Sequence, residues 1–466
     1  MGAQQGTDGG WGALLQPQGL PALAVLLGGV LLHSMNVLLL ATVLPTIVGE
    51  LGGAALMSWP TTAFLASSIV AATCTGLLTA SIGARAAFCT GAFVFGVGAT
   101  LCSLAPDMGW VVAGRFVQGF GGGVLTAVAY IVVRSTFPEA AWARAIALLS
   151  GMWSVSIVVG PLAGGAFARY GDWRGVFVAV SAIAFVLAVG AWWALPATAS
   201  APRKVPKVPG LRVALICAAI AGTSSAAVVA SPLAKAGLIA LSVVTLALMI
   251  RIDRRAKAPL LPGDAFSFAT QTGLGLWLVL LLCVAYSPVQ IFVPIFLQRL
   301  HGFDPLAAGY AVAGASFGWT SAALLVAGAA GAWPGRLMLA GPATMAVGLA
   351  ALALLAPSAP WPMLPAIVVL GAGIGVCWAF VAQRVMGGAR RGEEAIAASS
   401  VPTVQQMGFA LGAALAGLTA NTSGFSTGSA SGVAAAAFWV PASFVAPALL
   451  ALVIALRLRA RSTGRA

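Results

Sequence analysis

Apolar stretches of about twenty residues recur along the chain, separated by short polar turns. A helix needs about 20 apolar residues to cross a hydrocarbon core of about 30 Å. Inside lipid every backbone polar group must be hydrogen-bonded, which favours helices. The pattern therefore predicts an all-α polytopic membrane protein with fourteen spans. We expect these spans at residues 22–46, 56–80, 86–105, 109–134, 145–168, 174–195, 211–230, 233–250, 269–297, 306–330, 336–356, 362–384, 399–422 and 433–457.

Basic residues gather in alternate turns between the apolar stretches. Loops that face the cytoplasm carry an excess of Lys and Arg, so this asymmetry predicts that both termini are cytoplasmic. Omitting both spans between 211 and 250 would leave the asymmetry intact, so twelve spans remain an alternative. Only four basic residues fall in turns on the other side, namely Arg169, Arg174, Lys235 and Arg299.

Composition supports a membrane protein and excludes several other classes. Hydrophobic residues make up 60% of the chain and charged residues 7%, whereas soluble domains carry about 25% charged residues. The net charge of +14 is spread over separate loops, which argues against a nucleic-acid partner. Six cysteines without CxxC spacing predict neither a metal site nor a disulfide framework. Residues 1–21 lack a basic n-region, so we expect no cleaved signal peptide. We expect no cofactor.

Polar and proline-rich stretches divide the chain into segments. The stretch 197–210 is basic and rich in proline, so it cannot be a span, and a second basic stretch follows residue 250. The expected layout is two six-helix bundles with an inserted two-helix hairpin. Its segments are an N-terminal cytoplasmic tail (1–21), a first bundle (22–196), a cytoplasmic linker (197–210), the hairpin with its basic loop (211–268), a second bundle (269–458) and a C-terminal tail (459–466).

Two motifs inside apolar stretches carry functional information. In the stretch Ser156 to Gly165, Gly160 and Gly164 share one helix face and allow another backbone to approach closely, while Pro161 removes a hydrogen bond and bends the helix. In the stretch Gly114 to Gly122, Arg115 and Gln118 are polar residues within a span. An arginine in such a place is costly and usually functional, although it could also extend to the nearer membrane surface.

These motifs resemble those of the major facilitator superfamily, and more closely its fourteen-helix drug/proton antiporter family. Further stretches extend the resemblance from about residue 35 to 417 in the expected order. It implies the major facilitator fold, a bent fifth helix that seals the cavity toward the cytoplasm, and a role for Arg115 in proton coupling. The additional matching stretches are residues 173–177, 254–262, 296–309 and 405–412.

The chain departs from that family at two positions. After the second helix only Gly76, Gly83 and Arg85 of the usual motif remain, and Ala80 replaces an aspartate of a cytoplasmic latch. In the first helix Asn36 replaces an aspartate, and all ten acidic residues lie in tails, loops or span ends. The usual carboxylate relay for protons, and the usual counter-charge for cationic drugs, are therefore missing.

His33 lies three residues before Asn36, on the same helix face. An imidazole titrates near neutral pH and could replace the missing acid as a coupling group. A neutral, hydrogen-bonded histidine is the alternative. Tyr286 and Gln290, four residues apart, suit the wall of a substrate cavity, to which Asn36 and Gln118 are also assigned; ordinary interhelical hydrogen bonding is the alternative for Tyr286 and Gln290.

The sequence favours a secondary active transporter that exports an amphipathic drug or metabolite by alternating access. A proton-independent transporter of a lipid or a neutral metabolite is the first alternative, and a polytopic membrane enzyme is the second. The chain has no GxxxxGK[ST], HExxH or GxSxG motif, which argues against an ATPase or an enzyme. We expect a monomer in the bacterial plasma membrane, with protons as a further partner.

Overall fold

Helices form almost all of the regular structure. The computed structural model describes residues 11–14, 16, 19–52, 56, 59–169, 172–196, 210–229, 231–256, 259–303, 305–358, 360–425 and 429–463. No strand occurs within these ranges. The expected linker at 197–210 lies outside them except for Gly210, as do residues 1–10 of the expected N-terminal tail.

The first part of the chain contains a short 3-10 helix and six long helices, η1 (Trp11–Ala13), α1 (Leu20–Leu51), α2 (Trp59–Ile82), α3 (Ala84–Ser103), α4 (Met108–Thr136), α5 (Glu139–Arg169) and α6 (Trp173–Ala194). The second part contains α7 (Gly210–Val228), α8 (Pro232–Asp253), α9 (Gln271–Ile291), α10 (Val293–His301), α11 (Pro305–Val326), α12 (Trp333–Leu355), α13 (Pro360–Gly387), α14 (Glu394–Thr422) and α15 (Ala430–Thr463).

Twelve helices in the described part of the chain are long and apolar enough to cross a membrane. The expected spans at 211–230 and 399–422 coincide with α7 and α14, which are helical but are not in this set. The span expected at 269–297 is interrupted at Phe292, where α9 ends and α10 begins. Pro294 explains the break, because its ring nitrogen cannot donate to the preceding turn.

Polar side chains begin several helices by accepting hydrogen bonds from free backbone N–H groups. Asp107 accepts from Trp110 N at 3.0 Å at the start of α4. Asp172 accepts from Gly175 N at 2.9 Å at the start of α6, and Thr270 accepts from Gly273 N at 3.1 Å at the start of α9. These caps place the turns between successive helices.

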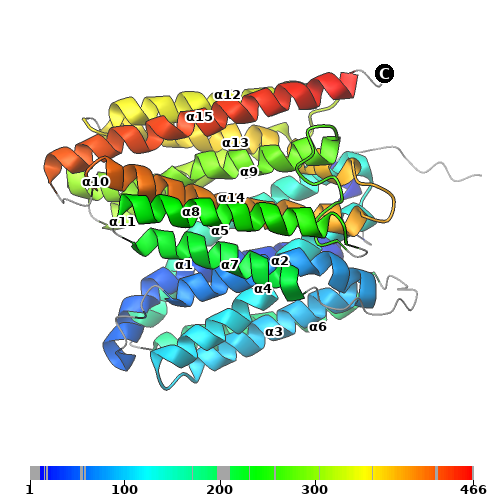
Figure 1. The fold of residues 1–466 in the computed structure, drawn as a ribbon. Helices are drawn as coiled ribbons and strands as arrows, with labels where there is room; N and C mark the ends of the chain where they lie inside the picture. Colours follow the sequence, from blue (N-terminus) through cyan, green and yellow to red (C-terminus); the bar gives the residue numbers. More distant parts are fainter. Residues whose placement is uncertain are drawn as a thin grey trace, which may run out of the picture.

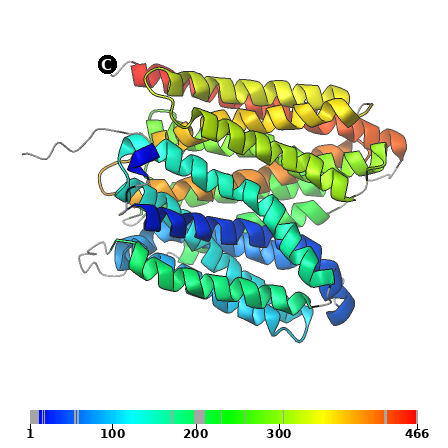
Figure 2. The same cartoon turned by 180° about the vertical axis from the view of Figure 1, so that it is seen from behind.

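The two sets of helices pack in matching patterns. In the first half (α1–α6), α4 packs on α2 and α3, and α1 packs on α5 and α6. In the second half (α9–α15), α13 packs on α11 and α12, and α9 packs on α14 and α15. The halves lie side by side in Figures 1 and 2 and meet along two interfaces, one where α14 packs on α2 and α4 and one where α5 packs on α11 and α13. Two structural repeats around a common interface are typical of secondary transporters.

The hairpin α7–α8 packs on the second half and on α2 (Figure 1). Asp253 at the end of α8 forms an ion pair with Arg212 of α7. At the other end of α8, Lys235 is buried and its Nζ donates to Gly417 O of α14 at 3.5 Å. Both ends of α8 are thus held by polar contacts.

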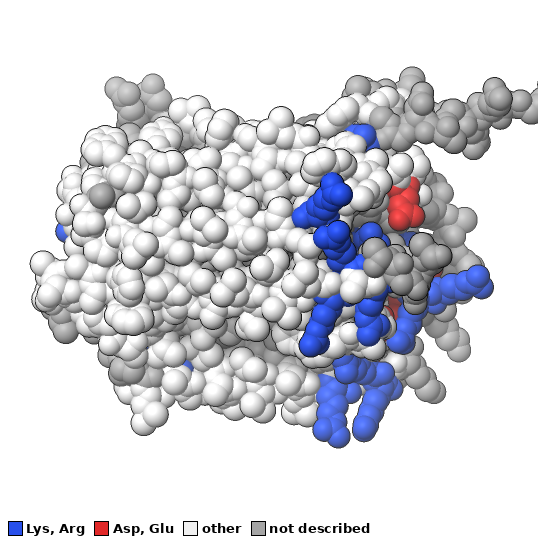
Figure 3. All heavy atoms as spheres, turned by 90° about the horizontal axis from the view of Figure 1, so that it is seen from above, with Lys and Arg blue, Asp and Glu red and all other residues white. Residues whose placement is uncertain are grey.

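Arginines gather at one end of the helix bundle, which we call the basic end. Figure 3 shows blue side chains concentrated there on the face in view. Helices α4, α8, α13 and α15 finish at this end, and their last turns carry Arg134, Arg251, Arg384 and Arg461. A cation near a helix C-terminus is favoured by the helix dipole.

Candidate functional site

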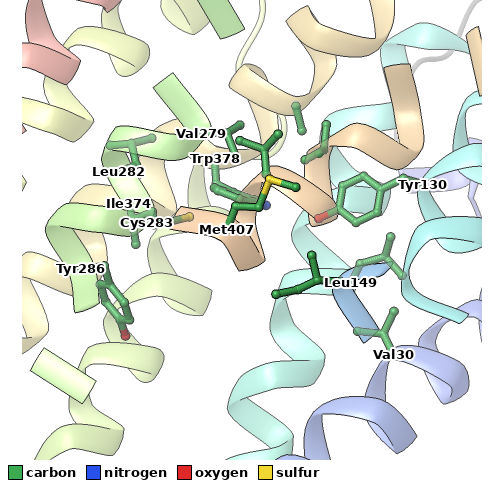
Figure 4. Close-up of a cluster of buried hydrophobic side chains, with 14 of the residues drawn as sticks. Val30, Tyr130, Leu149, Val279, Leu282, Cys283, Tyr286, Ile374, Trp378 and Met407 are labelled. Carbon is green, nitrogen blue, oxygen red and sulfur yellow. The ribbon is translucent and has the colours of Figure 1, made fainter. Parts of the chain in front are cut away.

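A cavity of about 1310 Å³ lies between the two halves. Ligand pockets for drug-sized molecules span roughly 300–1,000 Å³, so this cavity is large. Figure 4 shows Val30, Tyr130 and Leu149 on one side, from α1, α4 and α5, and Tyr286 of α9 on the other. Both halves therefore contribute to the wall.

The lining combines apolar surface with uncharged polar groups. No Lys, Arg, His, Asp or Glu is among the lining residues that the structure describes. Tyr286 and Gln290 line the cavity, as expected from the sequence, whereas His33, Asn36, Arg115 and Gln118 are not in the lining. The other polar lining residues are Thr42, Thr126, Tyr130, Ser150, Ser154, Tyr310, Ser316, Gln405 and Gln406.

Aromatic rings form a continuous part of the wall in the second half. The Tyr286 and Trp319 rings meet edge to face with centroids 5.5 Å apart, and Phe409 lies 6.2 Å from Tyr286. Trp319 in turn meets Trp378 at 5.4 Å. Such pairs add about 0.5–1.5 kcal/mol each beyond burial, so this wall is preorganised.

The cavity is closed at the basic end by contacts between the halves. Arg134 of α4 donates to Met386 O of α13 at 3.0 Å, and Gln383 of α13 donates to Glu139 O at the start of α5 at 3.1 Å. Gly76 packs so closely on α14 that a Cβ there would lie 3.0 Å from Ile396 Cα. The cavity lining instead reaches Ala166 on α5 and Pro294 and Tyr310 of α10 and α11, toward the opposite end.

The remaining motif residues at the basic end act within the first half. Gly83, with φ +83°, joins α2 to α3 in a conformation that favours glycine. Arg85 donates to Trp192 O at 3.2 Å and its Cζ lies 4.7 Å from the Trp192 ring centroid. Arg85 therefore contacts α6 within the first half, and the contacts between the halves at this end involve Gly76 and Arg134.

A polar cluster is buried inside the first half, beside the cavity. Arg115 is 1% exposed, so its side chain does not extend to the surface. Its guanidinium donates to Gln118 Oε1 at 2.8 Å, to Asn36 Oδ1, and to Pro60 O at 3.5 Å. Its Cζ lies 4.1 Å from the centroid of the Phe64 ring. Neutral acceptors and an aromatic face surround the charge. We call Asn36, Phe64, Arg115 and Gln118 the arginine cluster.

His33 lies between the arginine cluster and the cavity wall. Its ring stacks on Phe64 at 5.2 Å and meets Trp153, a cavity-lining residue, edge to face at 6.1 Å. His33 is fully buried, and neither ring nitrogen has a hydrogen-bond partner among the described residues. A chain of ring contacts thus joins the cavity to Arg115 through Trp153, His33 and Phe64.

The glycine motif of α5 packs directly on α1. A Cβ on Gly160 would lie 3.0 Å from Met35 O, and one on Gly164 would collide with Thr42 Oγ1. Ser156, where the family motif has its first glycine, donates to Met152 O at 2.7 Å and shares a hydrogen bond with Ser34. Pro161 and Gly165 also lie within α5, whose ribbon bends along its length (Figure 2).

A second glycine pair, on α14, repeats this arrangement in the second half. A Cβ on Gly408 would lie 2.7 Å from Cys283 Cβ of α9, and one on Gly412 would lie 2.8 Å from Val284 O. Helix α14 packs on α9 as α5 packs on α1. The spacing of four residues was visible in the sequence, but its pairing with α9 required the structure.

An ion pair joins α1 to α6 at the end opposite the basic end. Glu50 accepts from Trp173 Nε1 at 2.7 Å and pairs with Arg174, which also donates to Ala105 O at 3.1 Å. The hydrogen bond from Arg174, followed by that from Trp173, lowers the pKa of the Glu50 carboxyl. Within the described residues no group of three or more His, Cys, Asp or Glu side chains could hold a metal.

Comparison with known sequences gives one consistent result. The family model described as Major Facilitator Superfamily matches residues 26–413. A probable multidrug-efflux transporter of Mycobacterium tuberculosis is 35% identical over 431 residues, covering 89% of this chain and 90% of the relative. The multidrug transporter protein MdtP of Bacillus subtilis is 27% identical over 285 residues, covering 58% of this chain and 51% of the relative.

Two solved structures share the fold. The human organic anion transporter MFSD10 superposes with a TM-score of 0.69 at 15% identity, covering 94% of this chain and all of that chain. The proton:xylose symporter XylE superposes with a TM-score of 0.62 at 16% identity, covering 93% of this chain and 94% of that chain. At these identities the likeness concerns the fold alone.

Proposed function

The chain belongs to the major facilitator superfamily, and from this premise we propose that it exports an amphipathic small molecule by alternating access. It is a transporter and not an enzyme. The observation that carries the proposal is the cavity of about 1310 Å³ between the halves, closed at one end by contacts of Arg134 and Gln383. Rocking of the halves about this cavity would open one end as the other closes.

The charge asymmetry supports an orientation in the membrane. Arginines mark the cytoplasmic side of a membrane protein, so we place the basic end in the cytoplasm of a bacterial cell, together with both termini. In this orientation the structure corresponds to an outward-facing state, ready to release a solute. Its multidrug-efflux relatives support export of drug-like amphiphiles. In our proposal the multi-pass chain works as a monomer.

We propose that all fourteen helical units cross the membrane. Helix α7 has 19 residues and packs along α8 in a hairpin, which is long enough for a short span. Helix α14 is less apolar because it lines the cavity with Gln405 and Gln406. Its position between α9, α2 and α4 keeps it away from lipid, so low hydropathy does not exclude a crossing.

Proton coupling, in this proposal, belongs to His33 and Arg115. All ten acidic residues lie in tails, loops or helix ends, so no carboxylate is available in mid-membrane. His33 contacts the cavity-lining Trp153 and stacks on Phe64, whose ring contacts Arg115. A solute against Trp153 would therefore act on His33 through the Trp153 ring. The buried Arg115 would disfavour a simultaneous positive charge on His33.

Proton-independent export of a neutral metabolite or a lipid is the second candidate. The uncharged lining favours it, because a neutral solute needs no counter-charge and no charge compensation in the cavity. The two candidates share the cavity and the rocking movement. They differ in whether a proton gradient drives accumulation.

The proposal is tested by expression in a bacterial host that lacks its own drug-efflux pumps. We expect lower retention of several amphipathic dyes and higher tolerance to drugs of that class. Ala313→Trp, which places an indole in the cavity, should abolish both effects, whereas Ala234→Trp on the exposed surface of α8 should preserve them. Unchanged retention with well-expressed wild type, across a broad panel, would count against export.

A further inference from the structure

We infer that the cavity selects uncharged amphiphiles that carry hydrogen-bond acceptors and discriminates against organic cations. This inference rests on the export function proposed above and specifies its substrate. It stands on three features of the described residues: an uncharged lining, unpartnered donors in that lining, and a buried arginine beside it.

An organic cation would find no counter-charge in the cavity. The described lining contains no Asp or Glu, and an unpaired charge is costly to bury. Aromatic faces could substitute through cation–π contacts. However, the Trp319 ring is packed between Tyr286 and Trp378, and Trp153 is in contact with His33. These contacts occupy part of the aromatic surface that a cation would use.

Donors without partners face the same space. The amide groups of Gln290, Gln405 and Gln406 line the cavity and make no hydrogen bond with the part of the chain that the structure describes. Each of these amides offers two N–H donors and one carbonyl acceptor. These groups favour solutes with carbonyl, ether or phosphoryl oxygens.

A buried positive charge lies behind the α1 wall of the cavity. Arg115 is held by Asn36, whose chain neighbour Val37 lines the cavity. Its contacts are amide and carbonyl oxygens and the Phe64 ring, none of which neutralises the charge. A fixed positive charge beside a cavity of low dielectric constant raises the potential inside it and disfavours a second cation.

Two arylphosphorus probes, one with three phenyl groups and one with four, separate the possibilities. We would titrate the protein in lipid nanodiscs with triphenylphosphine oxide, a neutral acceptor, and with tetraphenylphosphonium, a cation. A parallel titration of empty nanodiscs measures the heat of partition into lipid, which is then subtracted. We expect the neutral probe to bind at least about tenfold more tightly, a difference equivalent to about 1.4 kcal/mol. Equal or tighter binding of the cation, or no binding of the oxide, would overturn the inference.

Variants identify the residues responsible. Replacing Gln290 and Gln405 together by alanine should weaken binding of the oxide about fivefold or more, while Gln271→Ala, at the basic end of the same helix α9 and outside the lining, should not. Gln406→Glu should strengthen tetraphenylphosphonium binding about tenfold by supplying the missing carboxylate. An unchanged affinity in the double variant would remove the glutamines from recognition.

The charge inference and the export proposal fail in different ways. Calorimetry needs no transport, so a protein that binds the oxide but changes no drug retention would contradict export alone. A protein that exports tetraphenylphosphonium efficiently would contradict the charge inference and leave export in place.

Discussion

The guanidinium carbon of Arg115 lies 4.1 Å from the centre of the Phe64 ring. A buried arginine in this chain thus rests on an aromatic face, with its N–H groups directed to the oxygens of Asn36, Gln118 and Pro60. Because Phe64 also stacks on His33, one phenyl ring lies between the side chains of Arg115 and His33. Transport should depend on these contacts.

Arg115→Ala should impair transport far more than Arg174→Ala. Removing Arg115 leaves buried acceptors on Asn36 and Gln118 without a donor, at a cost of about 1–3 kcal/mol each. Arg174 is partly exposed and its pair with Glu50 is solvated, so its loss should matter little. Efflux at matched expression, with Arg115→Lys as a variant that keeps the charge but not the planar fork, measures the difference. Equally small losses of efflux in Arg115→Ala and Arg174→Ala would show that the arginine cluster has no role in transport.

Gly164→Leu should abolish transport while the protein still reaches the membrane. Any side chain at this position collides with Thr42 of α1, so the α1–α5 contact must open. Gly412→Leu should have the same effect at the α9–α14 contact. Gly237→Leu on α8 is the control, since no atom lies within 4 Å of a Cβ there. Normal efflux by a well-expressed Gly164→Leu variant would show that the glycine motif is not needed for transport.

The Glu50–Arg174 pair should lose its contribution only in acid. The pKa of Glu50 is lowered in the folded protein, so the stabilisation is complete above the ordinary glutamate value of about 4.3 and is lost as the pH falls through the lowered value. The difference in Tm between wild type and Glu50→Gln should therefore be constant from pH 7 to about pH 5 and shrink below about pH 4. A difference that shrinks between pH 7 and pH 5 would point to another group.

Reporter fusions test the number of crossings. Fusions after Gly210 and after Pro259 should both report cytoplasm, and fusions near Ser231 should report the outside, because α7 and α8 form a hairpin that spans the membrane in our proposal. A cytoplasmic signal near Ser231 would leave twelve spans and place the hairpin on the membrane surface.

His33→Ala should remove accumulation driven by a pH gradient and retain downhill exchange. His33 has no hydrogen-bond partner among the described residues yet contacts both Trp153 and Phe64, so it can respond to a solute and to a proton. Purified protein in liposomes with an imposed gradient is the assay. An unchanged gradient dependence would exclude His33, and a wild type that ignores the gradient would favour the proton-independent candidate.

Hydropathy and charge in the sequence predicted most of the helices. They predicted α1 to within a few residues and placed α13 at 362–384, where the helix runs from Pro360 to Gly387. The break at Phe292 was not expected, because apolar residues continue through it. Helix α14 was expected at 399–422 and runs from Glu394 to Thr422, although it is not among the twelve described helices that are long and apolar enough to cross a membrane, since a helix packed among other helices need not be apolar throughout.

Contacts between distant helices could not be read from the sequence. Asn36 was assigned to the cavity, but it is bonded to Arg115 on a helix 79 residues away. Gln405 and Gln406 were visible as polar residues, yet only the packing of α14 against α9 shows that they share a wall with Gln290. Helical spacing determines which residues share a face of one helix. It does not determine which other helix packs on that face.

The hairpin α7–α8 covers one of the two interfaces between the halves and leaves the other uncovered. It packs beside α2 and α14, whereas Val158 and Leu162 of α5 and Phe317 of α11 remain 59%, 69% and 67% exposed along the other interface. Two of these, Val158 and Leu162, also line the cavity. The two flanks of the helix bundle therefore differ in the plane of the bilayer: the α2–α14 flank lies behind the hairpin, and the α5–α11 flank does not.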